Sequence, residues 1–136
     1  WMAKHFWKKE LSYVGYGGTG KQVRDLVHIR DLFDLIDQQL HQFDKVNGQV
    51  FNIGGTRKVS ASLLELTAVC QQVTGNKIPI QSIAETRKAD IRIYLSDCTK
   101  AKNIINWEPK ITVPEIMEDI FSWIKDNEKS LKPILS

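Results

Sequence analysis

Two arginine–carboxylate pairs are the residues of this chain best suited to chemistry. Arg24 is followed directly by Asp25, and Arg87 is followed three positions later by Asp90. An arginine can donate two parallel hydrogen bonds to a diphosphate and stays charged at any relevant pH. A neighbouring carboxylate can anchor that guanidinium or accept from a ribose hydroxyl. Isolated pairs of this kind are more often solvated surface salt bridges worth about 0–1 kcal/mol, so their spacing alone does not establish a site.

A glycine-rich stretch precedes the first pair. Gly15-x-Gly17-x-x-Gly20 has the spacing of a dinucleotide-binding loop. Its extension to Lys21 is close to a P-loop, although Gln22 stands where Ser or Thr would hold magnesium. Both loops need a helix directly after them, so that its N-terminal amides face the phosphates. The residues after Gly20 favour extended structure, so we predict a turn between two strands. A phosphate loop over the same residues is the less favoured alternative.

The cysteines and histidines form no recognisable site. Cys70 and Cys98 belong to no Cys-x-x-Cys pair, which indicates buried or idle thiols and neither a disulfide nor a metal site. The three histidines have no ligand spacing such as i, i+4. We therefore expect no metal.

Composition narrows the classes of function. The chain has 136 residues, 42% hydrophobic and 26% charged, as expected of a soluble globular protein with its own core. The net charge is +3, and the one dense basic cluster, at residues 4–9, is too short for a nucleic-acid arm. No apolar run approaches the roughly 20 residues that span a bilayer, and the N-terminus lacks the apolar stretch of a signal peptide. A cytoplasmic protein with no nucleic-acid or membrane partner is expected.

Short strands alternating with helices must position these side chains. Strands are predicted over 11–14, 49–53, 78–80 and 91–95. The region 21–43 contains no Gly or Pro, and its apolar spacing suits one long helix, although its first part also suits a strand. We favour a strand followed by a helix over 32–43, with Asp31 as its N-cap.

Further helices complete the pattern. Residues 2–9 suit the last turns of a helix, and Ser60 is predicted to cap a helix that stops at Gly75. Asp97 is predicted to cap a helix through Ile105, and a final amphipathic helix covers 113–127 before a frayed tail. The predicted fold class is therefore α/β, with amphipathic helices against at least one sheet and no linker within 1–136.

The order of these elements resembles the C-terminal, substrate-binding part of the extended short-chain dehydrogenase/reductases, the NAD-dependent nucleotide-sugar epimerases and dehydratases. The resemblance covers residues 10–130. Seven ordered elements carry it: Arg24-Asp25, Asp31-Leu32, Phe51-Asn52-Ile53-Gly54, Ser62-Leu63-Leu64-Glu65-Leu66, Arg87-Lys88-Ala89-Asp90, Asp97-Cys98-Thr99-Lys100-Ala101 and Trp107-Glu108-Pro109. Three departures are Lys88-Ala89 in place of Pro-Gly, Phe51 in place of Tyr, and Arg30 in place of an acidic residue. Residues 16–25 look most like the branch of CDP-tyvelose (CDP-paratose) 2-epimerases.

The resemblance implies roles for four residues. Arg24 and Arg87 would hold the diphosphate of a CDP- or UDP-linked sugar, Asp90 would contact the ribose, and Tyr94 would pack beside the nucleotide. It also implies NAD as the cofactor of the full-length enzyme, whose chemistry needs a Tyr-x-x-x-Lys pair. No tyrosine here has Lys at the fourth position after it. We expect no catalytic or cofactor-binding residue in this chain, and no activity or NAD binding by the chain alone.

Two interpretations follow. In the first, this is the nucleotide-sugar-binding portion of an epimerase whose Rossmann half lies upstream of Trp1. In this family the helix at 31–43 and the strand at 49–53 would pack onto the cofactor-binding sheet. Their apolar faces would then lead this chain to self-associate or to pair with another subunit. The alternative is a non-catalytic fragment that acts as a binding or association module.

Overall fold

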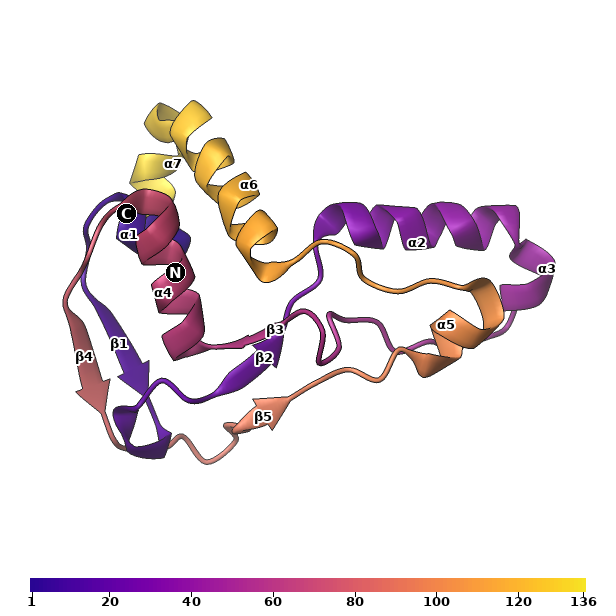
Figure 1. Cartoon of the computed structure of the whole chain (residues 1–136), viewed down its shortest axis with the longest axis horizontal. Coiled ribbons are helices and arrows are strands. Elements are labelled where there is room, and N and C mark those ends of the chain that lie inside the picture. The colour runs from indigo at the N-terminus through magenta and orange to yellow at the C-terminus, as the bar shows by residue number, and fades with distance from the viewer.

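A small central sheet joins a larger lobe to a narrower one (Figure 1). The structure is a computed structural model and describes all 136 residues. The larger lobe contains α1 (Met2–Phe6), β1 (Leu11–Val14), α4 (Leu63–Thr74), β4 (Ile80–Ile83), α6 (Val113–Asp126) and α7 (Glu128–Leu135). The narrower lobe contains α2 (Ile29–His41), α3 (Phe43–Val46) and α5 (Thr99–Ile105). The central sheet consists of β2 (Val23–Asp25), β3 (Ser60–Ser62) and β5 (Ile93–Tyr94). The α/β class predicted from the sequence is confirmed.

The strands form two separate sheets. In the larger lobe β1 pairs in parallel with β4, with Leu11 opposite Ile80 and Val14 opposite Ile83. In the central sheet β2 lies between β3, to which it is antiparallel, and β5, to which it is parallel. The predicted strand at 11–14 is confirmed. The strand predicted at 78–80 starts only at Ile80, because Pro79 has no N–H to donate to a ladder, although its carbonyl accepts from Leu11 N at 3.3 Å.

Each lobe has its own core. The larger core packs α1, α4 and α6 together through Met2, Val59, Ala61, Cys70, Val113, Ile116, Met117 and Ile124. The smaller core consists of Leu35, Cys98, Ala101, Ile105 and Trp107. Cys70 and Cys98 are buried and free, as predicted. Burial raises the pKa of the Cys70 thiol to about 11, because the charged thiolate is poorly solvated inside the core.

The start of α2 differs from the sequence prediction. A strand followed by a helix is correct, but Asp31 is not the cap. The N-cap is His28, whose Nδ1 accepts from Arg30 N at 3.1 Å. Asp31 lies buried in the first turn, where its Oδ2 accepts from Lys110 N and Ile111 N, both at 3.1 Å. A tertiary role for this carboxylate therefore overrides its local preference for the cap position.

The start of α4 also differs from the sequence prediction. Ser60 belongs to β3 and lies opposite Asp25, so it does not cap the helix. The N-cap is Ser62, whose Oγ accepts from Glu65 N at 3.2 Å, while Glu65 Oε2 accepts from Ser62 N at 2.8 Å. The pKa of Glu65 is lowered, because its carboxylate accepts hydrogen bonds from Ser62 N and, at 2.7 Å, from Ser62 Oγ. The predicted stop at Gly75 is confirmed by its left-handed φ of 70°.

The predictions for residues 49–53 and for the C-terminal tail are wrong. Residues 49–53 form no strand, because no other strand of the chain runs beside them, although Phe51 and Ile53 pack against the smaller core. The C-terminal tail is not frayed: it forms α7, where Leu131 packs against the larger core and Trp7 Nε1 donates to Glu128 Oε1 at 3.3 Å. None of the helices combines the length and apolar character needed to cross a bilayer.

Candidate functional site

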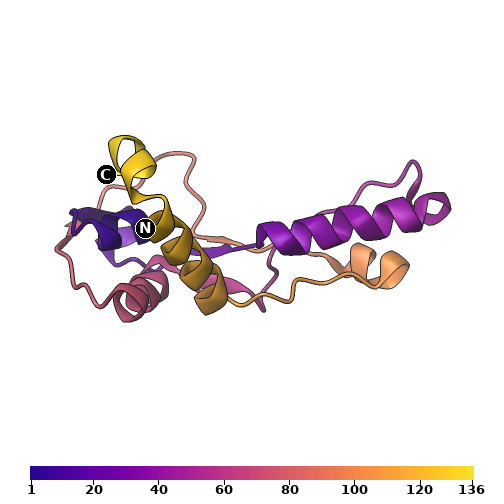
Figure 2. The ribbon, with the colours of Figure 1, turned by 90° about the horizontal axis from the view of Figure 1, so that it is seen from above.

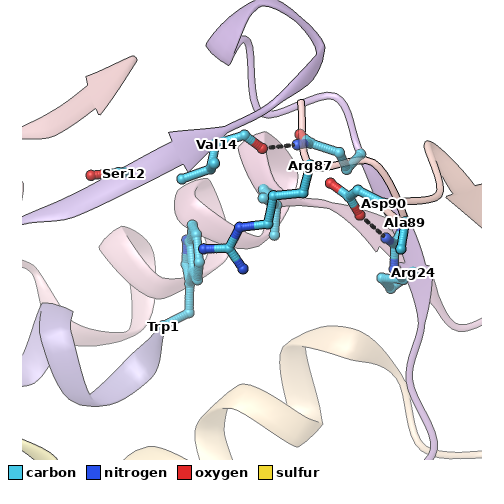
Figure 3. A pocket seen from close by; sticks show the side chains of 9 residues that line it. Trp1, Ser12, Val14, Arg24, Arg87, Ala89 and Asp90 are labelled. Atoms are coloured by element: carbon cyan, nitrogen blue, oxygen red, sulfur yellow. Dashed lines mark hydrogen bonds and ion pairs between the residues drawn. The ribbon is translucent and has the colours of Figure 1, made fainter. Parts of the chain in front are cut away.

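A cavity of about 480 Å³ lies where the two sheets approach each other (Figure 3). It is lined by Trp1, Ser12, Val14, Gln22, Arg24, Leu63, Arg87, Ala89 and Asp90. Strand β1 provides Ser12 and Val14, β2 provides Arg24, and the loop after β4 provides Arg87 and Asp90. The structure therefore brings together three of the residues singled out in the sequence. The volume is in the range of small-molecule sites.

Arg24 and Asp90 form an ion pair on one side of this cavity (Figure 3). Arg24 Nη2 lies 3.0 Å from Asp90 Oδ1, and the side chains are 40% and 27% exposed. Arg24 also donates from Nη1 to the carbonyl of Val23 at 2.8 Å. At this exposure the pair contributes only about 0–1 kcal/mol to stability. Its main effect is to orient a guanidinium that still has donors free for a ligand.

Asp25 does not face the cavity. Its Oδ2 accepts from Thr56 N at 3.1 Å and from Ser96 N at 3.0 Å, so it fastens two loops to β2. Side chains of neighbouring strand residues point to opposite faces. The hypothesis that Asp25 anchors the guanidinium of Arg24 is therefore wrong, and Asp90 takes that role.

Arg87 contributes a second positive charge. Its exposed side chain extends across the cavity toward Trp1 (Figure 3), and it makes no ion pair with a carboxylate of the chain. The Arg87 carbonyl accepts from Asp90 N at 3.0 Å, so a tight turn holds both residues at the cavity. This turn forms although Lys88-Ala89 replaces the Pro-Gly of the family pattern.

The fourth predicted site residue, Tyr94, does not line the cavity. It lies on β5 directly opposite Arg24 in the parallel ladder, and its side chain is 53% exposed. Its role beside a nucleotide stays a prediction.

Sequence reasoning did not propose Tyr16 or Gln22 as site residues. The Tyr16 hydroxyl donates to the carbonyl of Asp90 at 2.6 Å, and Tyr16 N donates to Thr86 Oγ1 at 2.8 Å. Tyr16 therefore holds in place the loop that carries Arg87 and Asp90. Gln22 lines the cavity and donates from Nε2 to the carbonyl of Val14. Both residues fall within the stretch that resembles the 2-epimerase branch, which was the one signal that could have drawn attention to them.

The glycine loop is a turn between two strands, as predicted. Its first part is the short 3₁₀ turn Tyr16–Gly18, and β2 follows it where a phosphate loop would need a helix. A Cβ on Gly20 would lie 2.9 Å from the ring of Tyr13, so this glycine permits close packing. The P-loop alternative is therefore wrong, and these residues do not fit the diphosphate of NAD.

Comparison with known proteins shows which family this chain is related to. Residues 3–120 match the family described as GDP-mannose 4,6 dehydratase. Over 106 residues the chain is 34% identical to the CDP-paratose 2-epimerase of Salmonella typhi, covering 78% of this chain and 31% of that protein. Over 117 residues it is 32% identical to UDP-glucose 4-epimerase 2 of Arabidopsis thaliana, covering 85% and 32%. The chain thus spans about a third of the length of the curated relatives that it matches.

Solved structures of a nucleotide-sugar epimerase and of a dehydratase superpose on most of this chain. The UDP-glucose 4-epimerase of Thermotoga maritima with UDP-glucose superposes with a TM-score of 0.73 at 28% identity, over 93% of this chain and 38% of that one. The dTDP-glucose 4,6-dehydratase of Bacillus anthracis in complex with NAD gives 0.72 at 27% identity, over 97% and 40%. The chain therefore belongs to the NAD-dependent nucleotide-sugar epimerase/dehydratase family of extended short-chain dehydrogenase/reductases.

Proposed function

We propose that residues 1–136 form a single nucleotide-sugar-binding portion of an epimerase and hold the nucleoside diphosphate. The observation that carries this proposal is the convergence of Arg24, Arg87 and Asp90 on one cavity from two separate parts of the chain. A diphosphate needs cations that are accessible and not fully neutralised by the protein. Arg24 is half-exposed beside one carboxylate, and Arg87 has no carboxylate partner.

Each residue has a distinct role in this proposal. Arg24, oriented by Asp90, and Arg87, from the turn that also carries Asp90, donate to the diphosphate oxygens. Asp90 Oδ2 meets no donor of the chain and accepts from a ribose hydroxyl. Tyr94 packs beside the nucleotide in this proposal. The chain binds substrate in this scheme and does not transfer hydride, because it has no Tyr-x-x-x-Lys pair and its glycine loop leads into a strand.

The nucleotide proposed is CDP. The support is the 34% identity to a CDP-paratose 2-epimerase together with the 2-epimerase-like stretch that ends at Arg24-Asp25. In such an enzyme the sugar would be oxidised to a keto-sugar, re-presented by its other face and reduced. The alternative substrate is a UDP-linked sugar, as in the 4-epimerase relatives.

Calorimetric titration with CDP and UDP tests this function. We expect CDP to bind more tightly than UDP, and Arg87→Ala to weaken CDP about ten- to hundredfold, the loss expected for one charge-assisted hydrogen bond. Lys88→Ala is the matched control, because it removes a cation from the same loop but not from the cavity wall. Failure of every nucleotide to bind the wild-type chain, or equal losses in the two variants, would refute the proposal.

A second candidate function, association with another polypeptide, is favoured by the outer face of α2. Ile29, Phe33, Ile36, Leu40 and Phe43 recur at helical spacing along α2 and the start of α3 and are between 49% and 70% exposed. Figure 2 shows α2 extending away from the larger lobe, beside α5. A continuous apolar stripe of this kind is typical of a covered surface. If it drives association, wild-type chains will sediment as concentration-dependent oligomers and Phe33→Glu chains as monomers; monomeric wild-type chains would contradict this candidate.

A further inference from the structure

The two walls of the cavity belong to different sheets. Ser12 and Val14 lie on β1, which pairs only with β4, whereas Arg24 lies on β2, which pairs with β3 and β5. No backbone ladder fixes one sheet to the other. A ligand that touches both walls therefore depends on whatever sets their relative position.

The Gln22 side chain spans this gap. The residue is only 4% exposed, and its Nε2 donates to the carbonyl of Val14. A carbonyl can only accept, so the amide must present its NH₂ group to Val14 and its Oε1 must point the other way. Gln22 lies two positions before Arg24, and both side chains reach the same cavity.

Gln22 Oε1 is an unusual atom in this chain. It is one of two buried side-chain polar atoms without a hydrogen-bond partner, the other being His5 Nε2 in the larger lobe. An unpaired buried acceptor costs free energy, and such an atom in a native structure calls for a specific explanation. An apolar side chain of the same length would avoid this cost but would also release the carbonyl of Val14.

We propose that Gln22 is a positioning residue for nucleotide binding: it holds β1 at a fixed offset from Arg24, so that a nucleoside diphosphate fits both walls at once. This inference rests on the proposed function. The proposed role of Gln22 predicts different effects on the binding of two kinds of ligand. A nucleoside diphosphate contacts both walls, whereas inorganic pyrophosphate reaches only the guanidinium groups of Arg24 and Arg87.

The test compares CDP and pyrophosphate binding to the wild-type chain and to Gln22→Met by calorimetry, with thermal unfolding of both proteins. Methionine keeps the length of glutamine but cannot donate to Val14. We expect CDP affinity to fall about tenfold, the equivalent of one lost hydrogen bond, and pyrophosphate affinity to stay within about twofold. Equal weakening of both ligands, or unchanged CDP affinity, would overturn the positioning role alone. A wild-type chain that binds neither ligand would overturn the proposed function together with it.

Gln22→Glu provides a second test should the methionine variant fail to fold. A protonated glutamic acid can donate to the Val14 carbonyl as glutamine does, whereas a carboxylate cannot. Asp90, Arg24 and Arg87 are the charged groups that share this cavity, so every measurement is compared with the wild type at the same pH. We expect the ratio of CDP to pyrophosphate affinity to approach the wild-type ratio as the pH is lowered. A ratio that does not change with pH relative to the wild type would contradict the proposal.

Discussion

Asp90→Asn should strengthen the binding of pyrophosphate more than the binding of CDP. Asp90 is the one carboxylate on the cavity wall, and its Oδ1 is 3.0 Å from Arg24 Nη2. The substitution keeps the side chain's shape and an acceptor oxygen but removes the negative charge. A diphosphate bound by Arg24 no longer meets a repelling carboxylate. The ribose, in contrast, loses a charged acceptor.

The size of the effect follows from the geometry. A phosphate oxygen bound to Arg24 would lie about 6 Å from Asp90, where two unit charges repel by about 0.7 kcal/mol at the dielectric constant of water and about 3 kcal/mol at an effective value of 20. Because both side chains are partly exposed, the lower part of this range applies, and pyrophosphate should bind about three- to tenfold more tightly. For CDP the weaker ribose contact offsets this gain, so the ratio of CDP to pyrophosphate affinity should fall.

Calorimetry with both ligands at low and moderate ionic strength measures these changes. The gain for pyrophosphate should shrink as salt is added, because the groups are solvent-accessible. Glu85→Gln is the matched control: it makes the same change in net charge in an exposed side chain that does not line the cavity. Weaker pyrophosphate binding to Asp90→Asn, or an equal gain in the control, would show that Asp90 does not face the bound diphosphate.

Three further predictions concern stability and reactivity. Asp31→Ala should lower the free energy of unfolding by about 2–4 kcal/mol, since two backbone N–H groups lose a charged acceptor, and Asp31→Asn by about 1 kcal/mol; urea unfolding that finds equal losses would contradict this. The Cys70 thiol, with its pKa of about 11, should resist a thiol reagent at pH 8 until the chain unfolds; rapid labelling of the native chain would show that it is accessible. The lowered pKa of Glu65 adds stability that is present above its unfolded-state pKa and is lost as the pH falls through its folded-state pKa, so Glu65→Gln should flatten the acidic part of the stability profile.

Local patterns in the sequence predicted most of the elements. The strand at 11–14, the stop at Gly75 and the turn between strands at the glycine loop all depend on neighbouring residues, and all are confirmed. The true cap of α4 was also visible locally, because Ser62 and Glu65 have the spacing of a capping box. Choosing Ser60 overlooked that its segment pairs with β2.

Long-range partners could not be predicted in the same way. Asp31 has the residue type of an N-cap, and only the approach of the chain at Lys110 and Ile111 shows why it is buried. The segment 49–53 has the composition of a strand, but a strand also needs a neighbour to bond with. The resemblance supplied Arg24, Arg87 and Asp90 as a group. It did not indicate which carboxylate pairs with which arginine.

The Arg24-Asp25 pair shows how a strand can separate two tasks. With a side-chain period of two, adjacent residues cannot face the same ligand, so one faces the cavity and the other faces the protein. Asp25 uses one oxygen to fasten the loops at Thr56 and Ser96, which keeps β2 in place behind Arg24. Arg24 forms its ion pair with Asp90 instead. Asp90 lies in a turn after β4, and its carbonyl accepts a hydrogen bond from the Tyr16 hydroxyl. The charge that faces a ligand is therefore set by residues on three elements, and moving any one of them would change affinity without touching the arginine.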